Sequence, residues 1–384
     1  MTEPRFLQIH SLHSYSAVLL NRDDTGLAKR LPYGGKMRTR ISSQCLKRHW
    51  RANDSVFNLH NIAGAEEAYR SREVLTNLVF ADLEAPAEVI GIIKTQFQKS
   101  VYGDKGADLK GRQPLLIGAP EVRWLKAEAK KLVAEANGSA KAADDLVKEW
   151  AKTYKAVAKQ MRDTSQLPGG LTSALFGRMV TSDPEANIDA PVHVAHAFTV
   201  HEQEDESDYF SVVDDLKRDD EDAGAAHIGE TELTSGLFYG YVVVDVPGLV
   251  SNLTGCERKD WQKADREIAG KVVQHLVHLI AEVSPGAKLG STAPYGYAEM
   301  MLIEAGDRQP RSLSGAFRAP CDPNLDAATA AFKAKLAALD EAYATGEARR
   351  HLHIAGAGLP GSQKLPLTGL AEWAGAVVAR GEAQ

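Results

Sequence analysis

The hydrophobic pattern of this chain changes period along its length, and this change constrains the fold more than any other feature. Residues 5–13 follow a strand pattern, with Leu7 and Ile9 on one face. From about residue 63 to residue 161, Ala, Glu and Lys are abundant and apolar residues recur at helical spacing. Strand patterns then return. The sequence therefore predicts an α+β chain in which a long helical insertion interrupts a sheet.

The remaining elements are predicted in the same way. Strands are expected at 171–181, 192–201, 237–246 and 300–303, and helices at 260–283, 325–343 and 367–378. The polar, turn-forming stretch 182–190 predicts a protruding hairpin, and an acidic loop is expected at 202–208. The order strand, helix, strands, helix, strand is ferredoxin-like, the arrangement that also underlies the common RNA-recognition module.

One segment concentrates positive charge in an otherwise acidic chain. Residues 29–51 carry eight Lys or Arg, and no Asp or Glu lies between Asp24 and Asp54, whereas the 384-residue chain has a formal net charge of -6. A solvated basic surface is one interpretation. The other is a polyanionic partner, because charge gathered on one face attracts phosphate while the rest keeps the protein soluble. We therefore expect a phosphate-bearing ligand.

The local pattern of this segment predicts a grip for phosphate. Gly34-Gly35 permits a tight turn, residues 37–41 alternate as a short strand, and either Ser42 or Ser43 can cap the helix that follows. Side chains four residues apart share one face of that helix. The polar stripe consists of Ser43, Lys47 and Arg51, and an apolar stripe beside it consists of Leu46 and Trp50. A phosphate at this helix start would meet backbone N–H groups, hydroxyls and cations.

Spacing argues against a nucleotide-binding loop. The phosphate loop of nucleoside triphosphatases requires Gly, four residues, Gly-Lys, and then Ser or Thr. Here the position five before Gly35 is Arg30, and Met37 follows Lys36. The segment fails this pattern.

Composition limits the remaining classes. No run approaches the roughly eighteen apolar residues of a membrane span, and no secretory signal pattern follows Met1. We therefore expect a cytoplasmic protein with no membrane partner. The three cysteines, Cys45, Cys256 and Cys321, are odd in number and far apart, so neither a disulfide framework nor a thiolate zinc site is indicated. We predict no cofactor, no metal ligand and no catalytic residue.

Short motifs follow one another in a fixed order along the chain. The N-terminal ones are Asn21-Arg22-Asp23-Asp24, Gly34-Gly35-Lys36, Arg40-Ile41-Ser42-Ser43-Gln44 and Leu46-Lys47-Arg48. The later ones are Gly177-Arg178-Met179, Ala195-His196-Ala197, Val213-Asp214-Asp215-Leu216, Ala226-His227, Ser235-Gly236, Phe238-Tyr239 and Pro285-Gly286-Ala287-Lys288. This set resembles the CasC-type backbone subunit of the type I-E CRISPR surveillance complex, Cascade.

The resemblance implies a hand-shaped subunit that assembles in several copies along a CRISPR guide RNA for antiviral defence. Its partners would be the guide RNA, other copies of itself, other Cascade subunits and a target DNA strand. The implied ferredoxin-like (RRM-like) palm begins at residues 1–60 and resumes at 193–384 with C-terminal helices. Between these parts lie a helical finger insertion at 61–165, a palm strand at 166–178 and a thumb β-hairpin at 179–192.

The resemblance also implies which residues contact the guide. Backbone contacts fall on Lys29, Ser42, Ser43, Gln44, Lys47, Arg48 and Arg51, and further RNA contacts on Arg178 and Met179. Met179 would act as an apolar wedge between bases, although an isolated methionine is usually core filler. The residue chemistry agrees, because a guide differs in sequence between complexes and its holder must grip phosphates and shape.

The last helix of the insertion, predicted at about residues 140–161, carries a stripe of lysines with two interpretations. A lysine stripe is commonly a solvated face. The fingers of the family also touch target DNA, which would use Lys148, Lys152, Lys155 and Lys159.

Two sets of residues suggest an enzyme. Asp23 and Asp24 precede the basic segment, where a divalent metal could be held against RNA, so a metal-dependent endoribonuclease of the same superfamily is the alternative function. Pairing of these carboxylates with Arg22 or a neighbouring copy is the structural interpretation. A generic single-strand RNA-binding protein is a third possibility.

The histidines form the second set. On a strand, His193 and His201 share a face and His196 points the other way, so the three do not converge on a metal. His275 and His278 lie beside the core stripe of the predicted helix at 260–283. We interpret both groups as structural.

Overall fold

The computed structural model describes residues 3–165, 167–212, 227–356 and 358–383, and the chain divides into two compact units. The sheet unit comprises Met1–Asn58, Val194–Val244 and Val273–Gln384. The helical unit comprises Leu59–His193 and Asp245–Val272. The expected finger insertion therefore falls in the helical unit, together with residues 166–192, which were expected to form a palm strand and a thumb.

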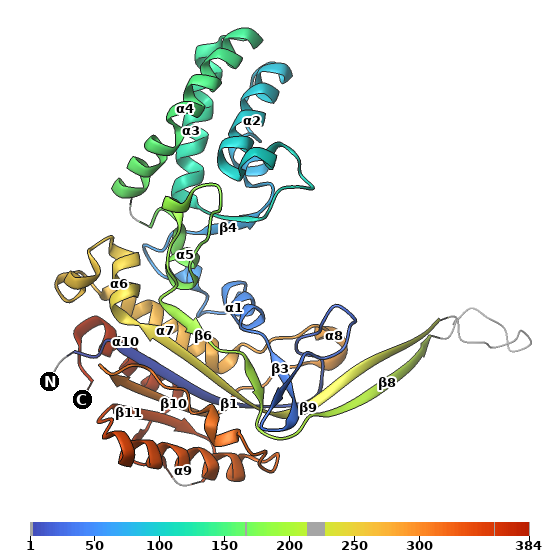
Figure 1. The fold of residues 1–384 in the computed structure, drawn as a ribbon, viewed down its shortest axis with the longest axis vertical. Helices are drawn as coiled ribbons and strands as arrows, with labels where there is room; N and C mark the ends of the chain where they lie inside the picture. Colours follow the sequence, from blue (N-terminus) through green and yellow to red (C-terminus); the bar gives the residue numbers. More distant parts are fainter. Residues whose placement is uncertain (1–2, 166, 213–226, 357, 384) are drawn as a thin grey trace, which may run out of the picture. The chain divides into compact units, whose positions relative to one another are not determined.

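The sheet unit is built on a large, mostly antiparallel sheet (Figure 1). Its strand order is β12-β11-β10-β1-β9-β7-β3-β2, with β8 paired to β9 outside this path. The strands are β1 (Phe6–Val18), β2 (Arg30–Tyr33), β3 (Lys36–Ile41), β6 (Val192–Val194), β7 (Ala197–Thr199), β8 (Glu204–Val212), β9 (His227–Asp245), β10 (Ala298–Gly306), β11 (Ala348–His353) and β12 (Gln363–Lys364). The predicted α+β class is confirmed.

Strand β1 is central and buried on both faces. It pairs antiparallel with β10, from Phe6 opposite Gly306 onward, and the register shifts between Leu12 and His13. Its first half is therefore almost continuously buried, as a strand covered on both faces should be. The strand predicted at residues 5–13 is confirmed and continues to Val18.

Helices account for much of the remaining sheet unit. They are α1 (Ser43–Arg51), α8 (Leu289–Thr292), the 3-10 helix η6 (Ser314–Phe317), α9 (Leu325–Tyr343) and α10 (Leu367–Arg380). Phe332 and Leu336 of α9 are fully buried against Tyr239 and Leu302 of the sheet. The two predicted terminal helices are confirmed. Helix α7 (Glu267–Glu282) starts later than predicted, because Arg258–Lys263 forms the separate 3-10 helix η5.

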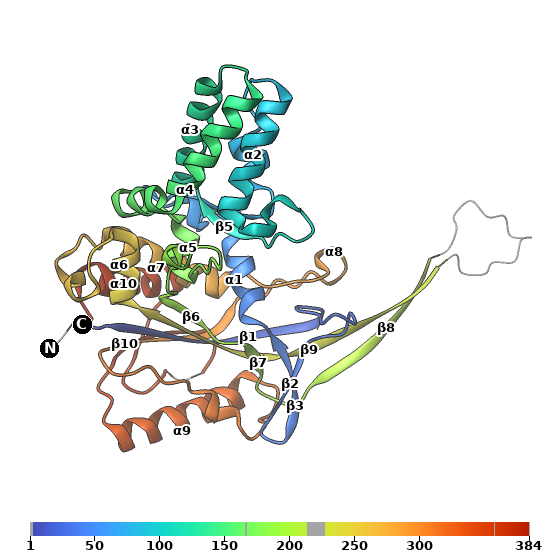
Figure 2. The same ribbon diagram turned by 45° about the horizontal axis from the view of Figure 1, so that its top comes forward.

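A long hairpin leaves the sheet where an acidic loop was predicted. Strands β8 and β9 pair from Glu204 opposite Ser235 to Val212 opposite His227, and both views show them running beyond the sheet (Figures 1 and 2). The prediction of a loop at residues 202–208 was wrong. All side chains at 204–211 are exposed, so this strand lacks the alternation of buried and exposed positions from which strands are recognised.

The helical unit has its own apolar core. Helices α2 (Ala87–Tyr102), α3 (Ala119–Ala136) and α4 (Ala140–Thr164) pack around it, and the Phe97 ring stacks on Trp150 with centroids 3.8 Å apart. Its smaller elements are η1 (Leu59–Asn61), β4 (Ala68–Ser71), the π-helix η2 (Leu75–Val79), η3 (Asp104–Ala107), β5 (Leu115–Gly118), α5 (Gly170–Phe176), η4 (Pro184–Ala186) and α6 (Val246–Thr254). The helical character predicted for this region is confirmed.

Residues 171–181 were predicted to form a strand, and this was wrong. Residues 170–176 form the short helix α5, which begins at Gly170 and ends before Gly177, and both glycines have positive φ (73° and 76°). A short apolar run fits a strand and a buried helix equally well, so periodicity alone could not separate them. The stretch 179–192 forms a loop with the 3-10 turn Pro184–Ala186, where a thumb hairpin was expected, and one backbone bridge joins Arg178 to Ile188.

Candidate nucleic-acid interface

Helix α1 is fixed to the sheet unit at its start and by its apolar stripe. The Ser42 hydroxyl caps the helix by accepting the N–H of Cys45 (3.2 Å), and the Ser42 N–H donates to Asn21 Oδ1 (2.9 Å). Trp50 is buried, and Leu46 packs against the cluster around Phe238. The predicted cap and apolar stripe are confirmed, and these contacts hold the outer face of α1 at the surface.

The outer face of α1 combines cations with polar groups. The helix contains no Asp or Glu; Gln44 and Arg48 are exposed, while Ser43, Lys47 and Arg51 are half-buried. Burial lowers the pKa of Lys47. Arg48 and Arg51 lie in the last turn, where cations also complement the helix dipole. Ser42 differs from the other predicted contacts, because it is buried, its hydroxyl caps the helix and its N–H donates to Asn21.

Three more polar residues gather at the start of α1. The carbonyl of Lys29 accepts the backbone N–H of Arg40 (2.7 Å), and Arg40 Nη1 lies 3.0 Å from His196 Nδ1. The backbone N–H of Ser43 also points at this His196 nitrogen, at 3.4 Å. Burial lowers the pKa of His196, and the nearby charges of Arg40 and Lys29 lower it further. The predicted contact Lys29 is thus joined by Arg40 and an exposed histidine.

The basic segment also contains cations that serve the fold. Arg38 is fully buried and donates to the carbonyls of Thr199 (3.0 Å), His201 (3.1 Å) and Phe317 (3.0 Å). Arg30 pairs with Glu232 and Asp205 of the β8–β9 hairpin, and Lys36 pairs with Glu202 (2.9 Å). The number of Lys and Arg residues in this segment is therefore larger than the number that can bind a phosphate.

Most histidines that were examined as metal ligands are structural, as predicted. His201 Nε2 accepts the N–H of Leu237 (3.1 Å), and His275 Nδ1 lies 3.0 Å from the carbonyl of Phe57. The ring of His278 stacks on Phe57 with centroids 3.5 Å apart. His193 and His196 are exposed, and His196 lies beside α1.

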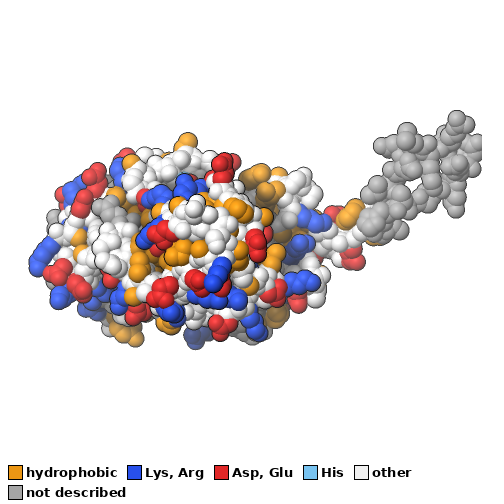
Figure 3. Space-filling view, turned by 90° about the horizontal axis from the view of Figure 1, so that it is seen from above, with side chains coloured by type: hydrophobic (Ala, Val, Ile, Leu, Met, Phe, Trp, Pro, Cys, Tyr) orange, Lys and Arg blue, Asp and Glu red, His pale blue; other side chains and the backbone are white. Residues whose placement is uncertain are grey.

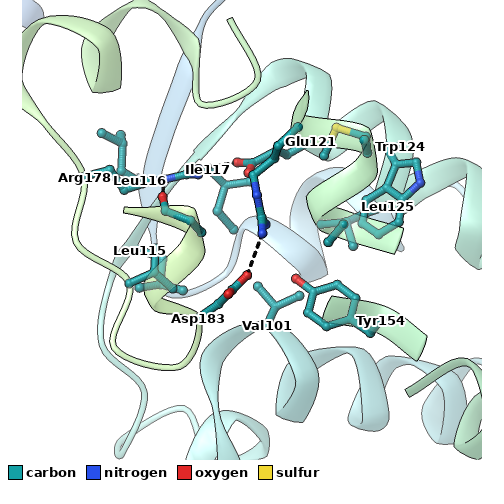
Figure 4. A pocket seen from close by; sticks show the side chains of 15 residues that line it. Val101, Leu115, Leu116, Ile117, Glu121, Trp124, Leu125, Tyr154, Arg178 and Asp183 are labelled. Atoms are coloured by element: carbon teal, nitrogen blue, oxygen red, sulfur yellow. Dashed lines mark hydrogen bonds and ion pairs between the residues drawn. The ribbon is translucent and has the colours of Figure 1, made fainter. Parts of the chain in front are cut away.

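The assignment of Arg178 as an RNA contact was wrong. Its side chain is buried in the helical unit, where Nε donates to the carbonyl of Ala186 (2.8 Å) and Nη1 forms an ion pair with Glu121. It lines a cavity of about 40 Å³ with Tyr154 and Asp183 (Figure 4). Met179 next to it is 78% exposed, so an apolar wedge remains sterically available at that position.

The lysine stripe of α4 is exposed but largely paired. Lys148 pairs with Asp144 (2.6 Å), Lys152 with Glu149 (2.6 Å) and Lys159 with Glu185 (3.4 Å). Lys155 is also exposed. The face of the molecule drawn in Figure 3 likewise shows cations and carboxylates interspersed. Exposed pairs of this kind are worth about 0–1 kcal/mol, so they shape the surface potential more than stability.

The Asp23 carboxylate organises its own loop. Its Oδ1 accepts the backbone N–H groups of Thr25 (2.9 Å) and Leu27 (3.0 Å) and the Thr25 hydroxyl (2.7 Å). The hydroxyl bond is the main reason that the pKa of Asp23 is lowered. Within the described ranges, no group of three or more His, Cys, Asp or Glu is arranged to hold a metal ion.

A family model described as CT1975-like protein matches residues 7–370. The chain belongs to this CT1975-like family. A solved chain titled "CRISPR RNA-guided surveillance complex, pre-nicking" is similar to it, with 24% identity, a TM-score of 0.73, and coverage of 97% of this chain and 100% of the other. A second, titled "CRISPR RNA-guided surveillance complex", has 20% identity, a TM-score of 0.56, and coverage of 95% and 98%. No curated protein matches.

These matches show that this CT1975-like chain has the fold of those solved subunits over nearly its whole length. The predicted resemblance is therefore confirmed for the CT1975-like family and for the fold. None of the helices in the described parts of the chain is long and apolar enough to cross a membrane.

Sequence reasoning missed two side chains of the candidate interface in this family member. Arg40 was placed in the basic segment without a role, and His196 was interpreted as structural. Ala195-His196-Ala197 lies more than 140 residues from α1 in the sequence, and pairing of β3 with β7 (Ile41 opposite Ala197) brings it to the helix start. The alternation of apolar and polar residues along the short strand β7 could not indicate that His196 would lie next to α1.

Proposed function

We propose that this protein is a non-catalytic RNA-binding subunit that oligomerises along a CRISPR guide RNA. One observation carries the proposal: the acid-free outer face of α1, with Lys29 and Arg40 at its start, on a fold shared with chains of CRISPR RNA-guided surveillance complexes. Cations, hydroxyls and backbone N–H groups grip phosphates without reading bases. Such a grip suits a guide whose sequence differs between complexes.

The finer assignment follows the sequence motifs. We propose a CasC-type backbone subunit of a type I-E complex, acting in the cytoplasm beside other Cascade subunits and presenting guide bases to target DNA in antiviral defence. We also propose a ferredoxin-like palm. The order β1, α1, β7, β9, α7, β10 supports it, since these elements alternate as strand, helix, strand, strand, helix, strand.

Co-expression with a CRISPR transcript tests the central proposal. The purified protein should carry RNA and appear in micrographs as regular multimers whose length follows the length of the transcript. Particles that bind RNA without regular multimers would indicate a generic single-strand binder. A monomer free of RNA would contradict the proposal.

We propose no catalytic step for this chain. The three hydrogen bonds accepted by Asp23 support a role in shaping its loop. Incubating the RNA-bound protein with Mg²⁺ tests this, and intact RNA is the expected result. Cleavage that requires Mg²⁺ and disappears in Asp23→Ala would establish the endoribonuclease alternative.

A further inference from the structure

The hydrogen bonds of His196 determine which of its ring nitrogens carries the proton. Arg40 Nη1 lies 3.0 Å from Nδ1, and a guanidinium can only donate. Nδ1 is therefore the acceptor, and in the neutral ring the proton is on Nε2. The Ser43 N–H, 3.4 Å from the same nitrogen, favours the same tautomer.

The charges around this ring keep it neutral. Burial, Arg40 and Lys29 all lower the pKa of His196. Protonating Nδ1 would replace an accepted hydrogen bond by a repulsive contact with the Arg40 guanidinium. His196 thus presents a fixed N–H donor at Nε2, and within the described residues no hydrogen bond to that atom is present.

We propose that His196 is a further guide-binding residue, whose Nε2–H donates to a phosphate oxygen of the RNA backbone held by α1. The inference rests on the proposed function. The ring is exposed, lies at the start of the helix that bears the predicted contacts, and is surrounded by the positive charge of Lys29 and Arg40. A donor of fixed direction adds geometric precision to side chains that otherwise act through charge.

A purely structural role for His196 is the competing explanation. In that case the ring would only hold Arg40 in place through Nδ1, and Nε2 would be irrelevant. The two explanations predict opposite effects for two amide substitutions. An Asn amide reaches about as far as Nδ1 and can accept from Arg40, whereas a Gln amide reaches about as far as Nε2 and can donate outward.

The test measures single-stranded RNA affinity of the full chain, carrying His196→Asn or His196→Gln, over a series of salt concentrations. We expect His196→Asn to weaken binding roughly tenfold, because a charge-assisted donor is lost. His196→Gln should lose about threefold or less, because the donor is kept. The salt slope should stay unchanged in both, since a neutral ring releases no counterion. Thermal melting verifies that both variants fold.

Equal affinities of the two variants, or weaker binding by His196→Gln than by His196→Asn, would overturn the assignment. Failure of the proposed function has a different signature. The wild type would then show no salt-dependent RNA binding, and Lys47→Ala with Arg51→Ala would change nothing. Retained wild-type binding with a normal affinity of His196→Asn refutes only the role of His196.

Discussion

Helices α1 and α4 carry similar stripes of positive charge, yet their surroundings differ. Helix α1 contains no acidic residue, and its cations face the surface beside Lys29 and Arg40. On α4, two lysines of the stripe pair with carboxylates three or four residues away on the same helix, and a third pairs with Glu185. The comparison teaches that a basic stripe indicates a polyanion site only where the helix does not supply its own counter-charges.

Arg178 extends this comparison to a cation that is both buried and paired. The sequence motifs predicted it as an RNA contact together with the cations of α1, but its side chain is buried and forms an ion pair with Glu121. A cation of this kind serves the fold, because a charge in the interior persists only when paired and hydrogen-bonded. The roles of the three groups can be separated by measuring stability and RNA binding on the same variants.

The largest effect is expected from Arg178→Met. Removing the guanidinium leaves Glu121 buried without its partner, which typically costs about 3–5 kcal/mol in the free energy of unfolding. Denaturant unfolding should show this loss, while the salt slope of RNA binding in the remaining folded protein stays that of the wild type. The control is Arg178→Met with Glu121→Gln, which should recover part of the stability. A flattened slope in either variant would restore Arg178 as an RNA contact.

The next largest effect is expected on RNA binding, and it distinguishes the role of α1 from that of α4. Lys47→Ala with Arg51→Ala should weaken single-stranded RNA binding by roughly 10- to 100-fold and reduce the salt slope by about 1.4, which is about 0.7 per phosphate contact. The loss should be the same for unrelated RNA sequences. Lys152→Ala with Lys155→Ala removes the same charge from α4 and is the matched control. Equal losses of RNA affinity in the two double variants would show that α1 and α4 do not differ in their contribution to RNA binding.

Much of this interface could be predicted from sequence because its signals are local. The turn at Gly34-Gly35, the cap at Ser42 and the burial of Trp50 depend on neighbours within a few residues, and all three are confirmed. The Gly34 turn shows why local chemistry suffices: its backbone has a φ of +62°, a conformation that favours glycine whatever lies nearby.

The rest depended on partners far away in the sequence. Arg38 belongs to the same basic run as Arg40, but three distant carbonyls turn it inward. His196 acquired its place through the β3–β7 pairing, and Arg178 through Glu121 on α3. Strand β8 is fully exposed along 204–211, so hydrophobic periodicity could not reveal it. Charge and periodicity report residue types, and tertiary pairing decides their roles.

A smaller effect is expected when α1 is made to resemble α4. Gln44→Glu places a carboxylate three and four residues before Lys47 and Arg48. The helix should gain about 0.2–0.5 kcal/mol per pair, while RNA affinity falls by roughly threefold to tenfold because the new charge repels phosphate. Gln44→Met is the neutral control. If Gln44→Glu binds RNA like the wild type, the absence of acids on α1 is irrelevant to its function.

The smallest effect comes from the reverse change, which gives α4 the character of α1. Asp144→Asn with Glu149→Gln removes the carboxylates that pair with Lys148 and Lys152. Exposed pairs contribute about 0–1 kcal/mol, so the unfolding free energy should change by less than about 1 kcal/mol. Binding of single-stranded nucleic acid should strengthen about twofold to threefold, with a slightly steeper salt slope. An affinity gain that rivals the loss caused by Lys47→Ala with Arg51→Ala would mean that α4 already lies against the nucleic acid, because only a surface in contact with phosphates responds that strongly to two charges.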